Sequence, residues 1–203
     1  MVHNHLEMTD RASSLELAFQ EFDRINAEDP RREVVDGQER PKELVYSLRM
    51  SEVLASFEPD ASEELRLAAR AQHIARWRIP RSSFPEGRSG YKKWRAKLQL
   101  EHAAMASSVL RQVGYGDDTI QRVTQLLKKQ GLKRDADVQA LEDVACLVFL
   151  RYYFDDFGRQ HDDDKLVDIL RKTWVKMSEK SQQTALELEL GERATRLLRR
   201  ALG

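Results

Sequence analysis

Apolar residues recur at helical spacing along nearly the whole sequence, and the alternating pattern of half-buried strands is nearly absent. The clearest helix is expected over 135–157. Its segment 144–150 is apolar on every face, which is typical of a central, buried helix. The sequence therefore predicts an all-α fold, with residues 1–203 forming a single compact domain of about eight helices.

Charge and cysteine content narrow the class of protein. The 34 Lys and Arg residues are balanced by 34 Asp and Glu residues, which argues against coating a nucleic acid or an anionic membrane through bulk charge. The lone cysteine, Cys146, cannot form an internal disulfide, as suits a reducing compartment. The longest apolar run is about a third of a membrane span, and residues 1–5 contain no apolar signal core. We expect a cytoplasmic protein without a membrane partner.

Three polar residues occupy positions that helical spacing directs into the core. His73 lies on a helix expected to run to Trp77, His102 lies on a helix over 91–113, and Asp143 precedes the apolar run. A carboxylate at such a position needs a charge partner, hydrogen bonds or a metal, because desolvation alone is costly. Two interpretations stay open: hydrogen-bonded core residues, or imidazole and carboxylate ligands of a divalent metal.

The order of these residues resembles the metal site of the HD-domain phosphohydrolase superfamily, which has an all-α fold. In this chain the order is an inward His73, the adjacent pair Glu101-His102, and then a single Asp143. The segment 141–147 resembles the final-aspartate helix of that superfamily. The resemblance covers roughly residues 60–155. It implies that His73, His102 and Asp143 hold a divalent metal ion (Mn, Fe, Co, Zn or Mg), with Glu101 as a further ligand or base. The implied catalytic residues are Glu101 and Asp143. The superfamily has Asp after the paired His, whereas Ala103 follows His102 here.

A second resemblance extends over most of the chain. The segments 71–77, 79–81, 90–95, 101–103 and 141–143 resemble an uncharacterised domain-of-unknown-function family that is often labelled glutamyl-tRNA synthetase-like. The segment 176–181 resembles the lysine-serine loop of class I synthetases with an insertion, and 73–76 is a poor copy of their histidine-glycine-histidine signature. Those enzymes need a parallel α/β fold that this sequence does not predict, so synthetase activity is not expected.

The segment 76–95 is strongly basic and contains interleaved aromatic residues. It holds seven basic residues and one acid. Arginine forks match phosphate oxygens, and aromatic faces stack on planar groups. We therefore predict that substrate binding involves Arg76, Arg81, Arg88, Trp94 and Arg95. In the alternative interpretation, these arginines pair with acids elsewhere and the tryptophans are core anchors.

Together these features predict a metal-dependent phosphohydrolase of the HD type, acting on a small phosphorylated or nucleotide-like substrate. The metal would lower the pKa of a bound water, and the arginines would stabilise phosphate charge. The alternative is a non-catalytic helical binding module whose basic patch binds an acidic partner or RNA. A nucleic acid is the less favoured partner.

Overall fold

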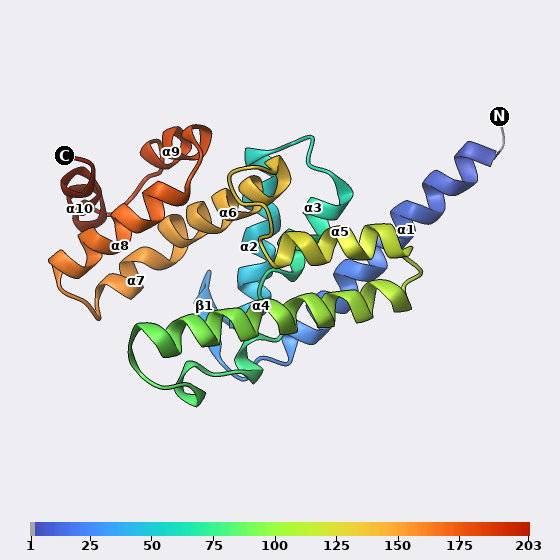
Figure 1. Cartoon of the computed structure of the whole chain (residues 1–203), viewed down its shortest axis with the longest axis horizontal. Coiled ribbons are helices and arrows are strands. Elements are labelled where there is room, and N and C mark those ends of the chain that lie inside the picture. The colour runs from blue at the N-terminus through green and yellow to red at the C-terminus, as the bar shows by residue number, and fades with distance from the viewer. Residues whose placement is uncertain (1–2) are drawn as a thin grey trace. The chain divides into compact units, whose positions relative to one another are not determined.

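The computed structural model describes the backbone of residues 3–203 and the side chains of residues 14–203 (Figure 1). The expectation that residues 1–5 contain no signal core concerns residues whose side chains the structure does not describe. The helices are α1 (His3–Ala27), α2 (Lys42–Phe57), α3 (Glu63–Ala71), α4 (Gly87–Gln112), α5 (Asp117–Leu127), α6 (Ala136–Val148), α7 (Phe154–Gly158), α8 (Asp163–Lys176), α9 (Glu179–Leu186) and α10 (Glu192–Leu202). The predicted all-α class is confirmed.

A short antiparallel hairpin, which the sequence analysis did not predict, joins the first two helices. Strands β1 (Arg32–Val35) and β2 (Gln38–Pro41) pair so that Arg32 faces Pro41. The turn residues Asp36 and Gly37 have φ values of 51° and 75°, the left-handed conformation that a two-residue hairpin turn requires. The Asp-Gly dipeptide is the sequence signal for this turn.

Residue contacts divide the chain into two compact units. The first unit comprises Met1–Glu52 and Asp60–Gln130, and the second comprises Val53–Pro59 and Gly131–Gly203. The expectation of one domain over the whole chain stays a prediction, and each unit is described by itself.

In the first unit, α1, α3, α4 and α5 pack against one another around buried side chains such as Phe22, Leu65 and Leu110. Ser62 caps α3 by accepting a hydrogen bond from the backbone N–H of Leu65. The helix ends at Ala71, earlier than the expected Trp77. The chain then turns through a left-handed Ala75 (φ 52°) into the 3₁₀ turn η1 (Arg76–Arg78). His73 therefore lies in a turn and not on a helix.

In the second unit, α6 is the buried helix that the apolar run predicts. Leu141 and Leu147 are at most 2% exposed, and α6 contacts α8 and α9. The helix expected over 135–157 is interrupted, because a π-helical turn, η3 (Phe149–Tyr153), separates α6 from α7. No helix in the described part of the chain is long and apolar enough to cross a membrane.

Candidate functional site

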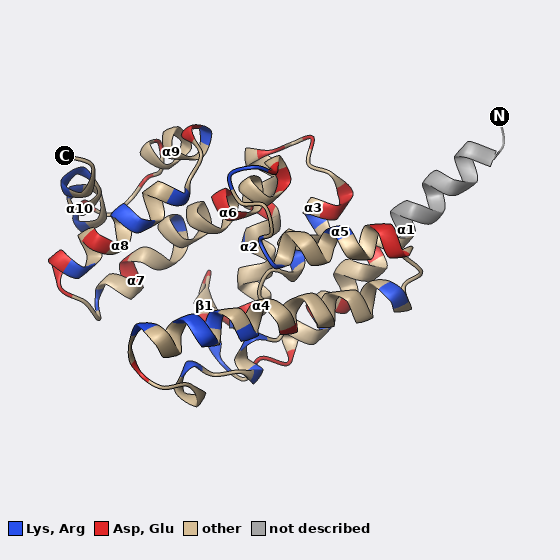
Figure 2. Cartoon of the chain, in the orientation of Figure 1, with Lys and Arg blue, Asp and Glu red and all other residues tan. Residues whose placement is uncertain are grey.

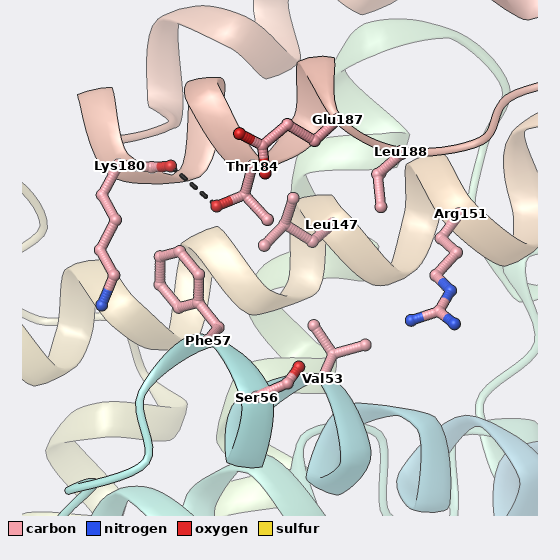
Figure 3. Close-up of a pocket in the computed structure, with 9 residues that line it drawn as sticks. All are labelled: Val53, Ser56, Phe57, Leu147, Arg151, Lys180, Thr184, Glu187 and Leu188. Carbon is pink, nitrogen blue, oxygen red and sulfur yellow. Dashed lines mark hydrogen bonds between the residues drawn. The ribbon is translucent and has the colours of Figure 1, made fainter.

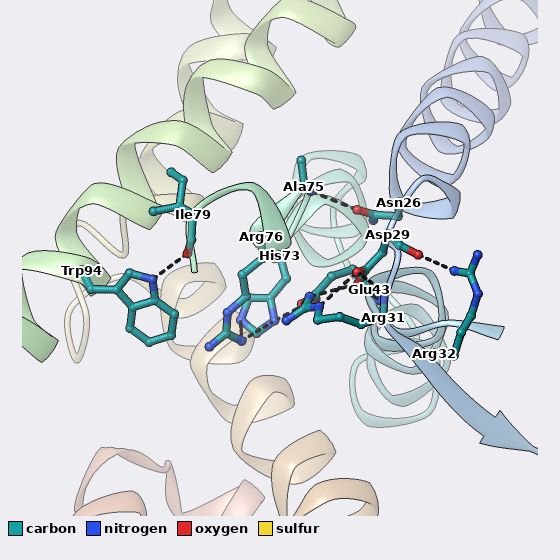
Figure 4. Close-up of polar contacts among 10 residues, drawn as sticks. All are labelled: Asn26, Asp29, Arg31, Arg32, Glu43, His73, Ala75, Arg76, Ile79 and Trp94. Carbon is teal, nitrogen blue, oxygen red and sulfur yellow. Dashed lines mark hydrogen bonds and ion pairs between the residues drawn. The ribbon is translucent and has the colours of Figure 1, made fainter. Parts of the chain in front are cut away.

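The turn that carries His73 is fixed by a buried amide from α1. Asn26 is fully buried, and its side-chain oxygen accepts a hydrogen bond of 3.0 Å from the backbone N–H of Ala75 (Figure 4). This bond holds the strained left-handed residue in place, so the turn presents His73 and Arg76 in a defined orientation.

His73 is enclosed by an aromatic ring, a carboxylate and a guanidinium. Its ring stacks on Tyr46 with centroids 3.9 Å apart and planes 13° apart. Its Nδ1 lies 3.6 Å from Oε2 of Glu43, and Nη1 of Arg76 lies 3.1 Å from Nδ1 and 3.3 Å from Nε2. The His102 ring centroid is 5.9 Å from that of His73. The structure thus brings the two predicted histidines together.

Trp94 holds both the arginine and the loop that follows it. The guanidinium of Arg76 lies 5.0 Å from the Trp94 ring centroid, and the indole N–H donates a 2.9 Å hydrogen bond to the carbonyl of Ile79. Trp94 is only 8% exposed. Its indole N–H and its ring face therefore both make contacts within the protein, and substrate binding by Trp94 stays a prediction.

A buried acid pair lies beside His73 and was not predicted from the sequence. Asp29 and Glu43 are at most 3% exposed. Arg31 binds Asp29 through two nitrogens (3.0 and 2.9 Å) and binds Glu43 at 2.6 Å. Asp29 also accepts the backbone N–H of Glu43 in the first turn of α2. Because Asp29 and Glu43 lie on opposite sides of the hairpin, no local sequence pattern signals their pairing.

Burial and neighbouring positive charges keep both imidazoles neutral. Burial, reinforced by the charges of Arg76, Arg95, Lys129 and Arg31, lowers the pKa of His73 well below its usual value. Burial, followed by the influence of His73 and Arg76, lowers the pKa of His102 to about 3. We call His73, Arg76, Arg95, His102 and Lys129 the cationic cluster.

Several polar groups of the cationic cluster have no partner to match their charge or hydrogen-bonding capacity. His102 is 6% exposed, and its Nε2 is buried without a hydrogen-bond partner. Among the described residues, neither Arg76 nor Arg95 forms an ion pair with a carboxylate, and the hydrogen-bond partner of Arg76 is His73. Half-buried cations without an ion pair and an unsatisfied imidazole are costly, and an anion would relieve both costs.

The other arginines predicted to bind substrate have different environments. The guanidinium of Arg81 donates hydrogen bonds of 2.9 Å to the carbonyls of Phe84 and Pro85, and so closes the loop before α4. Arg88 is exposed at the start of α4, where Figure 2 shows lysines and arginines following one another along the helix. The structure therefore brings Arg76 to His73 and uses Arg81 to hold the loop, while the charge of Arg95 lowers the pKa of both histidines.

The two acids of the predicted metal site have partners of their own. Glu101 pairs with Lys97 at 2.5 Å on the surface of α4. Asp143 belongs to the second unit and is 2% exposed. Its carboxylate accepts hydrogen bonds from Gln139 (2.9 Å), from the backbone N–H and hydroxyl of Ser178 (2.8 and 2.5 Å), and from the hydroxyl of Ser181 (2.8 Å). These bonds match the structural interpretation of Asp143.

The segment compared with a synthetase loop has a structural function here. Met177 is the C-cap of α8, and Ser178 is the N-cap of α9, where it accepts a hydrogen bond from the backbone N–H of Ser181. The same two serines bind Asp143. The lysine-serine segment is thus a helix cap fastened to α6.

The donor set does not favour a metal centre. Within the described residues, no group of three or more His, Cys, Asp or Glu side chains could hold a metal ion. Both ring nitrogens of His73 also lie next to the Arg76 guanidinium, whose charge repels a cation. The divalent metal and its ligands His73, His102, Asp143 and Glu101 stay a prediction.

The second unit contains a pocket of about 300 Å³ (Figure 3). Its lining combines apolar side chains such as Val53 and Leu147 with the charged residues Arg151, Lys180 and Glu187. Lys180 already pairs with Glu58 at 2.8 Å. With charges of both signs and a paired lysine, this pocket is less suited to an anion than the cationic cluster.

Fold and site together define a helical protein with a recessed, positively charged cluster built around two neutral histidines. The chain belongs to the family described as "Domain of unknown function (DUF4202)", whose family model matches residues 16–198. This confirms the resemblance to a domain-of-unknown-function family, whereas the synthetase-like label and the relation to the HD superfamily stay predictions. No curated protein and no solved structure matches the chain.

Proposed function

We propose that this protein binds a small phosphorylated ligand at the cationic cluster. The observation that carries the proposal is that the buried Nε2 of the neutral His102 has no hydrogen-bond partner among the described residues, where neither Arg76 nor Arg95 forms an ion pair with a carboxylate. Guanidinium groups bind phosphate oxygens through charge-assisted hydrogen bonds, and a neutral imidazole accepts or donates one more. The ligand would supply the negative charge and the hydrogen-bond partner that the cluster lacks.

The proposal is tested by titrating the purified chain with inorganic phosphate and with pyrophosphate by calorimetry, in a buffer free of other oxyanions. Replacing Arg95 with Met removes the charge and keeps much of the apolar stem. A charge-assisted hydrogen bond contributes about 1.5–3 kcal/mol, so Kd should rise by about tenfold to 150-fold. Arg111→Met is the matched control, because Arg111 is an exposed arginine in the last turn of the same helix, α4. If neither anion binds the native chain, the proposal is wrong.

Metal-dependent hydrolysis of the bound ligand, as in the HD superfamily, is a finer proposal. It is supported by the resemblance in residue order and by the two neutral imidazoles, since a metal ligand must be unprotonated. Metal analysis after dialysis against Mn²⁺ or Zn²⁺ tests it, with His102→Gln and Asp143→Asn as variants. Stoichiometric metal that both variants lose would support the HD-type site. A metal-free chain that binds phosphate would instead favour the non-catalytic binding module.

Aminoacylation is not part of the proposal. The described strands form one two-stranded antiparallel hairpin, whereas a class I synthetase needs a parallel nucleotide-binding sheet. The similarity to the lysine-serine loop is accounted for by the cap of α9.

A further inference from the structure

We propose that the cationic cluster selects a terminal phosphate, the end group of a phosphomonoester or pyrophosphate, and excludes the phosphodiester of a nucleic acid backbone. This inference rests on the proposed function and narrows it to one class of ligand. Three observations support it: the burial of the polar groups, the arginines that form no ion pair, and the contacts that aromatic rings already make within the protein.

The groups that would hold the phosphate lie below the surface. His102 is 6% exposed, the His73 side chain is 15% exposed, and Arg76 and Arg95 are half-buried. A diester phosphate carries a chain on both sides, so it can approach recessed groups only if both chains enter with it. A terminal phosphate has a single substituent and can insert its free oxygens while that substituent points outward.

The charge of the cluster suits a dianion. Among the described residues, Arg76 and Arg95 form no ion pair with a carboxylate, although the charge of Glu43, which Arg31 binds, partly offsets that of Arg76. Lys129 adds to the positive potential at His73, while Arg31 is already bound to Asp29 and Glu43. A phosphomonoester carries a charge of about −1.5 to −2 at neutral pH. A diester carries one negative charge and would leave part of the potential uncompensated.

Two aromatic rings beside the cluster are already engaged in the protein. Tyr46 stacks on His73, and Trp94 lies against Arg76. Proteins that bind single-stranded nucleic acids combine a basic groove with aromatic faces on which bases stack. Here these contacts position the phosphate-binding groups, so recognition is directed at the phosphate and not at a base.

A pair of oligonucleotides separates the two kinds of phosphate. Tetrathymidylate with a 5′-phosphate and the same oligonucleotide with a 5′-hydroxyl share every diester and differ only in the terminal group. We expect the phosphorylated oligonucleotide to bind at least about tenfold more tightly in calorimetry. Phenyl phosphate should likewise bind more tightly than diphenyl phosphate. Arg95→Met should remove the preference, and Arg111→Met should keep it.

The outcomes distinguish this inference from the proposal on which it rests. Equal binding of the two oligonucleotides, with inorganic phosphate also bound, would overturn terminal selection and leave the anion site intact. Absence of binding by inorganic phosphate, pyrophosphate and phenyl phosphate would overturn both. If Arg95→Met does not fold, the oligonucleotide and phenyl phosphate comparisons on the native chain still decide the inference.

Discussion

Acidification should destabilise this protein through its buried histidines. His102 has a folded-state pKa of about 3 and an ordinary value of 6.5, so the unfolded chain binds its proton more readily. By linkage, the stability that the neutral imidazole contributes is fully present above about pH 6.5 and is lost as the pH falls toward about 3. Between about pH 8 and pH 5, this single group should remove about 2 kcal/mol from the free energy of unfolding.

The measurement is urea unfolding followed by circular dichroism at several pH values in this range, in buffers without phosphate. His102→Gln removes the titrating group. Between about pH 8 and pH 5, its free energy of unfolding should therefore fall by about 2 kcal/mol less than that of the native chain. The pKa of His73 is lowered in the same direction, so the native chain should lose more than His102 alone accounts for.

A lower stability of His102→Gln at every pH would not matter, because the prediction concerns the slope. The reasoning is refuted if the native chain keeps a constant free energy of unfolding from about pH 8 to pH 5, or if His102→Gln shows the native slope. Either result would mean that the imidazole is not desolvated among positive charges. The argument for an anion at the cationic cluster would then lose its electrostatic basis.

Three further predictions concern the second unit, and each is checked by chemical denaturation at neutral pH. Leu147→Ala should cost about 2–5 kcal/mol, because the side chain is 2% exposed on α6; a cost below about 1 kcal/mol would contradict its place in the core. Ser178→Ala should cost about 1–2 kcal/mol, because it removes a helix cap and a donor to Asp143. Asp143→Asn should cost about 1–3 kcal/mol, because an amide cannot accept all four hydrogen bonds. Unchanged stability in Asp143→Asn would show that these bonds are not the reason for its burial.

Helical spacing predicted the class of fold and the burial of α6, because both depend on the periodicity of apolar residues. It did not predict where the helix before His73 ends. Ala69, His73 and Trp77 fit one continuous stripe, but the chain leaves the helix after Ala71 and turns at a left-handed Ala75. That turn depends on Asn26, which lies far away in the sequence. Local patterns carry no information about such a bond.

The candidate site was predicted in part. Arg76, Arg95, His73 and His102 could be chosen from charge and inward spacing. The structure brings His73, Arg76 and His102 together, and the charge of Arg95 lowers the pKa of both histidines. The acids Asp29 and Glu43 could not be chosen in this way. They meet across the hairpin, and their relation to His73 exists only in the folded chain.

An inward position on an apolar face does not show whether a polar residue is satisfied within the protein. His102 and Asp143 both occupy such positions. The difference lies in their partners. Asp143 receives four hydrogen bonds from Gln139, Ser178 and Ser181, so its burial is compensated within the protein. His102 keeps a buried nitrogen without a partner in a positive potential. A buried polar group that the fold satisfies contributes to stability, whereas one that the fold leaves unsatisfied costs free energy that a ligand can recover on binding. By this criterion we propose His102 and its arginines as the binding site, whereas Asp143 fastens the cap of α9 to α6.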